Sequence, residues 1–412
     1  MNKYKNILIF PMFWICLVVA TYSGLGESFL IGTTAISCLV AIKRAKGILF
    51  VHRNGETSFS FFIIYYIFTS AFGILMGYVG FKNYAELLLK YVCLPMIVYI
   101  LTPKDYIKRL EMLKVLKTII FISIIYGLIE SVIKYNYMVD FVQLNTNVWM
   151  QTMNKASNYQ PCSWFLHYNY YGCVLILGFV FALYIPYKKK LLNIIYWVML
   201  LEQILVCQSR ICWIAVVILI MIQIVISGKI TNKKIRNLIL VLMGCLCIVF
   251  FVPNIFSTLG NFIGERFSRL WIYGFEDGSL GQRLGTLMNW PIYFQRHVIK
   301  GLFGTGYQSI QVEFMKEYSF FKGYSTVDSQ ITVYLVETGI VGVLLLIIAL
   351  IDFFKKKRST DCYKQIISYI GKLSLCAFCI ECVTLDIVSN NIILSLVFLV
   401  IIITNKSKRN YE

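Results

Sequence analysis

Residues 211–227 read ICWIAVVILIMIQIVIS and contain no charged side chain. A helix of roughly 17–25 predominantly apolar residues is long enough to cross the hydrocarbon core of a bilayer. The stretch follows the polar sequence Cys207-Gln208-Ser209-Arg210 and precedes residues 228–236, which hold four Lys and Arg. This pattern predicts a membrane-spanning helix with a polar flank on each side.

Eleven further apolar stretches repeat this pattern along the chain. The 412 residues are 58% hydrophobic and 14% charged, with a mean hydropathy of +0.72, whereas soluble proteins average about 25% charged residues. We therefore expect an all-α integral membrane protein, a single polytopic membrane domain over 1–412 with about 12 transmembrane helices. The predicted spans are 7–22, 26–42, 59–80, 84–101, 117–133, 170–187, 191–207, 211–227, 237–253, 330–352, 366–383 and 387–404.

The basic residues predict which side of the membrane each segment faces. With the N-terminus in the cytoplasm, 26 of the 39 Lys and Arg fall in cytoplasmic segments and 11 in external ones. Cytoplasmic loops typically carry such an excess, so both termini are expected to be cytoplasmic. Orientation in the membrane thereby explains the net charge of +19, and we expect no nucleic-acid partner.

The longest polar segment, 254–329, lies on the external side between the ninth and tenth predicted spans. Its 76 residues hold seven basic and six acidic residues, together with many aromatic ones. Connections this long are usually functional, and such a mixture is typical of a folded segment. We expect it to cover the active site. Its aromatic side chains suit stacking on sugar rings, and anchoring at the membrane interface is the alternative.

Arg210 stands between two predicted spans and places a fixed positive charge at the external membrane face. An isolated arginine at such a place often only reaches toward lipid headgroups. Further motifs in and after the long segment favour a functional role. They are Gly281-Gln282-Arg283, Trp290-Pro291, Gly304-Thr305-Gly306-Tyr307, Asp328-Ser329-Gln330 and Leu335-Val336-Glu337-Thr338-Gly339-Ile340-Val341-Gly342.

In this order the motifs resemble the O-antigen polymerase and ligase superfamily, the Wzy and WaaL group. In that family a Ser-Arg pair opens a span, the large external loop carries an Arg, a Trp and a Gly-x-Gly turn, and the next span begins with His or Asp. The matching places here hold Ser209-Arg210, Arg283, Trp290, Gly304 to Gly306, and Asp328. The ligase branch has His-Asn where this chain has Asp328-Ser329, so the resemblance favours a Wzy-type polymerase.

The resemblance implies a membrane glycosyltransferase in the bacterial cytoplasmic (inner) membrane. Such an enzyme joins undecaprenyl-pyrophosphate-linked oligosaccharide repeat units into capsule, exopolysaccharide or O-antigen at the outer membrane face, with no cofactor and no metal ion. Its expected partners are the lipid-linked donor and acceptor, membrane lipid, a flippase and a chain-length regulator. Two alternatives stay open: a flippase or other transporter of the lipid-linked unit, and a glycan ligase.

In the implied reaction the leaving group is a pyrophosphate. Arginine binds phosphate oxygens bidentately and does not lose its proton, so Arg210 and Arg283 are expected to stabilise the departing charge. Asp328 is expected to orient or deprotonate the hydroxyl of the acceptor. The alternative is that Asp328 caps the helix that follows it.

Seven further residues are candidates for substrate binding: Ser209, Gln282, Trp290, Arg296, His297, Tyr307 and Glu337. Glu337 lies inside a predicted span, where a charge is costly and usually faces the interior of the helix bundle. An ion pair of Glu337 with Lys90 or Lys372 is the structural alternative. Gly339 and Gly342 are expected to allow close helix packing.

Overall fold

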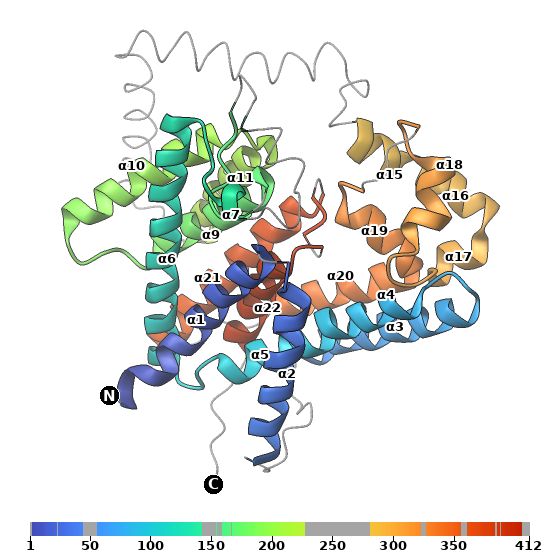
Figure 1. Ribbon diagram of the computed structural model, residues 1–412, viewed down its shortest axis with the longest axis horizontal. Coiled ribbons are helices and arrows are strands. Elements are labelled where there is room, and N and C mark those ends of the chain that lie inside the picture. Colours follow the sequence, from blue (N-terminus) through green and yellow to red (C-terminus); the bar gives the residue numbers. More distant parts are fainter. Residues whose placement is uncertain are drawn as a thin grey trace.

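The computed structural model describes residues 2–22, 24–43, 56–141, 154, 159–165, 167–226, 281–322, 327–355, 361–383, 385–387 and 389–405. Within these residues all regular secondary structure is helical (Figure 1). The helices up to residue 226 are α1 (Asn2–Tyr22), α2 (Gly26–Lys43), α3 (Glu56–Leu75), α4 (Phe81–Leu88), η1 (Leu89–Cys93), α5 (Leu94–Leu101), α6 (Tyr106–Ile133), α7 (Met138–Phe141), α9 (Tyr168–Tyr184), α10 (Lys190–Val206) and α11 (Arg210–Ile226).

The helices after residue 280 begin with a group of short ones. These are η3 (Gly281–Gly285), α15 (Thr286–Met288), α16 (Trp290–Arg296), α17 (Val298–Phe303), η4 (Gln311–Met315) and α18 (Lys316–Tyr318). They are followed by α19 (Gln330–Glu337), α20 (Gly339–Lys355), α21 (Cys362–Glu381) and α22 (Asn391–Asn405). The elements η1, η3 and η4 are π-helical turns, which are rare and occur frequently at functional sites.

Eleven of the twelve predicted spans coincide with helices of the described part, and the other, 237–253, lies outside it. Three of the described helical stretches are long and apolar enough to cross a membrane, namely Ser58–Leu75, Phe81–Leu101 and Tyr106–Ile133. Shorter apolar helices cover Ile7–Thr21, Tyr168–Tyr184, Arg210–Gln223 and Asn391–Asn405. Length and composition thus support a membrane protein.

One face of α3 carries a stripe of exposed apolar side chains. They recur every three or four residues and are Phe61, Ile64, Phe68, Phe72 and Leu75. Residues at this spacing share one face of a helix, and soluble monomers rarely expose contiguous apolar patches of this kind. Contact with lipid explains the stripe.

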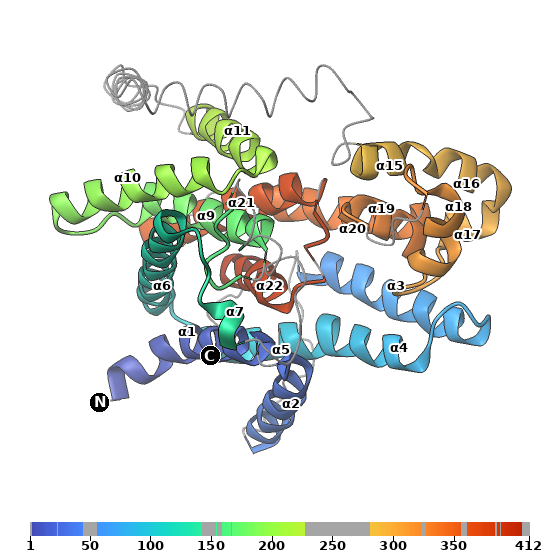
Figure 2. The same ribbon diagram turned by 45° about the horizontal axis from the view of Figure 1, so that its top comes forward.

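Two helices form the centre of the molecule. Nearly all of α9 is buried and packs against α6, α10 and α21, while α22 packs against α1, α5 and α21. On the other flank α3 lies between α4 and α20, and the short helices α15 to α18 gather with α19 near one end of this layer (Figure 2).

The predicted span 330–352 is two helices, α19 and α20, which are separated at Thr338. The chain resumes its helix at Gly339, whose φ of +66° is a left-handed conformation that favours glycine. An apolar run alone does not reveal such a break, because both halves have the same composition as a continuous span.

The sixth helix, α6, starts eleven residues before the predicted span, at Tyr106 rather than at residue 117. Two basic residues of this helix are buried, namely Arg109, which the sequence places before the predicted span, and Lys117, its first predicted residue. Arg109 donates a hydrogen bond to the carbonyl of Ile403 at 2.8 Å, and Lys117 donates to the carbonyl of Ile185 at 2.7 Å. These two cations satisfy backbone acceptors at the ends of α22 and α9, so their role is structural.

Glu130, near the end of α6, fixes the segment that precedes α9. Its buried carboxylate accepts hydrogen bonds from the Tyr159 hydroxyl at 2.6 Å and from the backbone N–H groups of Cys162 and Ser163 at 3.0 and 2.7 Å. The side-chain amide of Asn136 also donates to it, at 3.2 Å. One carboxylate thus satisfies donors from several points of the connection between α6 and α9.

Candidate functional site

Polar residues from several helix ends meet at one end of the described bundle. The backbone N–H of Gln330, at the start of α19, donates to the carbonyl of Cys382, just after α21, at 3.0 Å. The Lys90 ammonium in η1 donates to the carbonyl of Ser389, just before α22, at 3.3 Å. The starts of α19 and α22 and the end of α21 therefore lie close to the α4–η1 region.

Arg283 and Asp328 are brought together although 45 residues separate them. The Arg283 Nε lies 3.7 Å from a carboxylate oxygen of Asp328, and their side chains are 16% and 37% exposed. Arg283 belongs to the π-helical turn η3, and Asp328 precedes α19. Burial raises the pKa of Asp328 and the positive charge of Arg283 opposes this rise.

The helix-cap alternative for Asp328 is not supported by the position of α19. Its N-cap residue is Ser329, and Asp328 lies one residue earlier, facing Arg283. The Ser329 side chain makes no capping hydrogen bond. Asp328 is therefore an ion-pair partner and not the N-cap residue that the sequence pattern also allowed.

His167 is a neighbour of Arg283 that the sequence did not single out as a candidate. It is the N-cap residue of α9, where its Nδ1 accepts a hydrogen bond from the backbone N–H of Asn169 at 3.2 Å. Burial, with a smaller contribution from the charge of Arg283, lowers the pKa of His167 to about 3. The imidazole is accordingly neutral near pH 7.

Ser209 and Arg210 lie at the turn between α10 and α11. The turn passes through Gln208, which has a φ of +61° and whose side-chain carbonyl accepts a hydrogen bond from Gln160 at 2.9 Å. Ser209 is buried and faces Gly172 of α9, and Arg210 is the first residue of α11. A left-handed turn residue thus precedes Ser209, which packs against α9.

The same end of α9 therefore meets both sequence motifs. His167, close to Arg283, and Gly172, which faces Ser209, are five residues apart, or about 7.5 Å along a helix axis. Ser209 thus packs near the start of α9, and the charge of Arg283 acts on His167 at the N-cap of the same helix.

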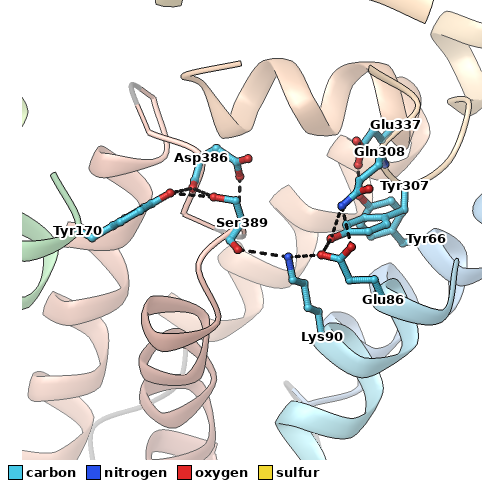
Figure 3. A network of polar contacts seen from close by, with 9 residues as sticks. All are labelled: Tyr66, Glu86, Lys90, Tyr170, Tyr307, Gln308, Glu337, Asp386 and Ser389. Carbon is cyan, nitrogen blue, oxygen red and sulfur yellow. Dashed lines mark hydrogen bonds and ion pairs between the residues drawn. The ribbon is translucent and has the colours of Figure 1, made fainter. Parts of the chain in front are cut away.

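Glu337 lies at the end of α19 and is fully satisfied by hydrogen bonds instead of an ion pair. It accepts hydrogen bonds from the Tyr66 hydroxyl and, at 2.7 Å, from the backbone N–H of Gln308 (Figure 3). Lys90 pairs with Glu86 at 2.7 Å, and Lys372 donates to a backbone carbonyl. The predicted ion-pair alternative for Glu337 is therefore wrong, because Lys90 has a nearer carboxylate on its own helix.

Glu86 extends this network toward the start of α22. Its carboxylate accepts from the Tyr307 hydroxyl at 3.0 Å and from the side-chain amide of Gln308 at 2.9 Å (Figure 3). Lys90, paired with Glu86, reaches Ser389, whose hydroxyl lies 2.9 Å from that of Tyr170 in α9. The contacts in Figure 3 thus connect the 304–309 turn, α4 and α9.

The Gly304-Thr305-Gly306 turn fits into the break between α19 and α20. Gly304 and Gly306 have φ values of +84° and +94°. The backbone N–H groups of Thr305 and Gly306 donate to the carbonyls of Val336 and Glu337 at 3.1 and 2.9 Å. The glycine motif therefore serves a backbone contact that holds the 281–322 segment against the bundle.

Replacing Gly339 with alanine is expected to destabilise this contact by at least about 2 kcal/mol, because a left-handed conformation alone costs an L-residue about 1–2 kcal/mol. An added Cβ would also lie 2.3 Å from the backbone oxygen of Leu302. Thermal unfolding of the purified protein in detergent measures the loss. Gly32→Ala is the control, since nothing lies within 4 Å of a Cβ there, and unfolding of both variants at the wild-type temperature would contradict the expectation.

A small apolar cluster, separate from the main core, includes Tyr293, Phe314 and Tyr318, and the other predicted substrate-binding residues lie in or beside it. Trp290 stacks on Phe294 with a ring distance of 5.3 Å, and the ring of His297 lies 5.2 Å from that of Tyr293. Arg296 is exposed and lies 5.9 Å from the ring of Tyr318. Gln282, next to Arg283, is buried and accepts a hydrogen bond from Ser319 at 3.4 Å.

Sequence reasoning missed several residues that the structure adds to this region. Glu86, Tyr170, Asp386 and Ser389 join the network, and Asp386 accepts a hydrogen bond from the backbone N–H of Ser389 at 3.2 Å. A signal was available for Glu86, because it is an acidic residue four positions before Lys90 within an apolar run.

Comparison of the chain with protein-family models and with curated proteins finds no match in either. Inference about function therefore depends on the residues just described.

Proposed function

We propose that the protein is a Wzy-type polymerase that joins undecaprenyl-pyrophosphate-linked oligosaccharide repeat units into capsule, exopolysaccharide or O-antigen. The donor glycan is transferred from its pyrophosphate to a hydroxyl of the acceptor unit. The observation that carries the proposal is the Arg283–Asp328 pair beside the helix end that also meets the Ser209-Arg210 turn.

The chemistry of the leaving group explains why arginine suits this place. A departing pyrophosphate develops negative charge, and preorganised donors aimed at such charge are usually the largest contribution to catalysis. A guanidinium has five N–H donors and can bind a carboxylate and a phosphate at the same time. In this proposal Asp328 orients Arg283, and Arg283 and Arg210 bind the pyrophosphate without a metal ion.

The proposal includes the finer topology. About twelve spans cross the bacterial cytoplasmic membrane, both termini are cytoplasmic, and the 254–329 segment is external. Support comes from the excess of Lys and Arg in alternate connections and from the position of the candidate residues at helix ends opposite to those connections. A flippase and a chain-length regulator are the proposed protein partners.

A flippase for the same lipid-linked unit is the main alternative. A transporter needs its two sides to open in turn around a central site, usually between related halves. The 76-residue segment on one side and the lack of evident related halves in the sequence disfavour it. A glycan ligase would share the chemistry and differ in the acceptor.

Reconstitution into proteoliposomes tests the function. Lipid-linked repeat units extracted from cells that lack this gene serve as both donor and acceptor. A polymerase lengthens the glycan and releases undecaprenyl pyrophosphate, which mass spectrometry detects. Movement of the units across the bilayer without lengthening would identify a flippase and reject the polymerase.

Asp328→Asn is expected to lower the initial rate of lengthening about 10- to 100-fold, because misplacing a catalytic group by about 1 Å can cost 10²-fold. The amide keeps the size of the side chain but removes the charge that holds Arg283. Asp328→Glu, which retains the charge, is expected to keep more activity than Asp328→Asn. A wild-type rate in the asparagine variant would dismiss a role for the ion pair.

A further inference from the structure

Glu381, the last residue of α21, is a fully buried carboxylate whose two oxygens have no hydrogen-bond partner among the described residues. Burying a charged or polar group without partners is costly, so such groups in native proteins require an explanation. A residue kept at that cost, near a candidate active site, points to function.

The other buried carboxylates of this end of the molecule are satisfied. Glu130 accepts hydrogen bonds from Tyr159, Cys162, Ser163 and Asn136. Glu337 accepts from Tyr66 and Gln308. The fold can therefore supply donors to a buried acid where it needs one for stability, and it supplies none to Glu381 within the described ranges.

The surroundings of Glu381 are those of the candidate site. Arg283 and Cys207 lie within electrostatic range of its carboxylate, and so do Cys173 of α9 and Cys212 of α11. Glu381 thus lies on α21, which packs against α9 and α11, and is within electrostatic range of Arg283.

Two buried serine hydroxyls in the same region also lack a hydrogen-bond partner among the described residues. Ser209 lies between Cys207 and Cys212 in the sequence, and Ser329 precedes Gln330, whose backbone N–H bonds to the carbonyl of Cys382. Both serine hydroxyls are buried and have no hydrogen-bond partner among the described residues. A carboxylate and two hydroxyls without hydrogen-bond partners in the described part, in the region of Arg283, could hydrogen-bond a ligand rich in hydroxyl groups.

Building on the proposed function, we infer that Glu381 is the catalytic base of the reaction and that Ser209 and Ser329 hold the acceptor sugar. The acceptor O–H bond breaks and its proton goes to the Glu381 carboxylate. The hydroxyl oxygen forms a bond to the anomeric carbon of the donor. The bond from that carbon to the pyrophosphate oxygen breaks, the electron pair leaves with the pyrophosphate, and the proton passes from Glu381 to water.

Asp328 is a poorer base than Glu381 in this arrangement. Its carboxylate is paired with Arg283, and an adjacent positive charge stabilises the ionised form and weakens its pull on a proton. Glu381 has no such contact within salt-bridge distance in the described part, so in its ionised form it has the greater affinity for a proton from the ligand. The two acids thereby divide the work: Asp328 positions Arg283, and Glu381 receives the proton.

The test compares Glu381→Gln with Glu130→Gln in proteoliposomes supplied with the lipid-linked units extracted from cells that lack this gene. General bases contribute about 10²–10⁴-fold to a rate, so Glu381→Gln is expected to lose at least about 100-fold in turnover. Its melting temperature is expected to stay unchanged or rise, because an unpartnered buried acid is replaced by a neutral amide. Glu130→Gln, at a fully bonded acid, is expected to melt at a lower temperature.

The outcomes separate the inference from the proposed function. If the wild-type protein lengthens the glycan and Glu381→Gln loses turnover at an undiminished melting temperature, the inference and the proposed function are both supported. Partial activity in Glu381→Asp strengthens the result. If the wild-type protein lengthens the glycan and Glu381→Gln loses less than threefold in turnover, the inference is overturned and the proposed polymerase function is retained. A lowered melting temperature in Glu381→Gln makes the residue structural and overturns the inference as well. Failure of the wild type to lengthen the glycan overturns the proposed function and the inference with it.

Discussion

Arg283→Ala is expected to reduce the rate of glycan lengthening at least about 100-fold, equivalent to ~3 kcal/mol of transition-state stabilisation. Loss of one preorganised electrostatic donor typically costs about 10²–10³-fold. Arg283 also pairs with Asp328, so its removal leaves that partly buried carboxylate without its cation. Both effects fall on the chemical step, and the initial rate in proteoliposomes under saturating substrate measures them.

Matched variants show whether the loss belongs to the site. Arg283→Lys keeps a charge but lacks the planar fork that grips two oxygens, so we expect it to recover only part of the rate. Arg210→Ala is expected to give a loss similar to that of Arg283→Ala. Lys82→Ala removes an exposed cation from the start of α4 and is expected to leave the rate unchanged. Full activity in both arginine-to-alanine variants would refute the assignment.

Glu130→Ala is expected to lower the free energy of unfolding by at least about 3 kcal/mol. The substitution leaves the Tyr159 hydroxyl and the N–H groups of Cys162 and Ser163 without their acceptor. Each buried donor deprived of its partner costs about 1–3 kcal/mol. Thermal unfolding in detergent measures the loss as a lower melting temperature.

The control for Glu130 is an acid that makes fewer contacts. Glu202 in α10 is half-buried and accepts a hydrogen bond from the neighbouring Gln203 at 2.7 Å. Glu202→Ala is expected to cost clearly less than Glu130→Ala. Equal stability of the Glu130 variant and the wild type would mean that water replaces the carboxylate at this point.

The helical segments could be predicted from the sequence, because the length of an apolar run and the spacing of charges report directly on membrane-spanning helices. The sequence could not locate the breaks inside those runs. Thr338 interrupts a stretch that is apolar on both sides, and the π-helical turn at Lys90 lies within a continuous apolar helix. Such features depend on tertiary partners, here the 304–306 turn and the carbonyl of Ser389, which accepts a hydrogen bond from Lys90.

For the candidate site, the order of the sequence motifs indicated some residues but not their contacts. Motif order indicated Arg283 and Asp328, which the structure pairs. It could not indicate that Glu337 bonds to Gln308, since that contact requires the left-handed conformation of Gln308 at a φ of +58°. His167 and Glu381 escaped notice as members of the site because they lie 116 and 98 residues from Arg283 in the chain.

The attachment of residues 305–308 to α3, α4 and α19 has a consequence for how the proposed polymerase would release its product. Hydrogen bonds to Ser70, Glu86 and Glu337 fix this corner of the 281–322 segment to three helices. In the proposed polymerase these hydrogen bonds would close this corner to a lengthening polysaccharide, which would leave by another face of the molecule.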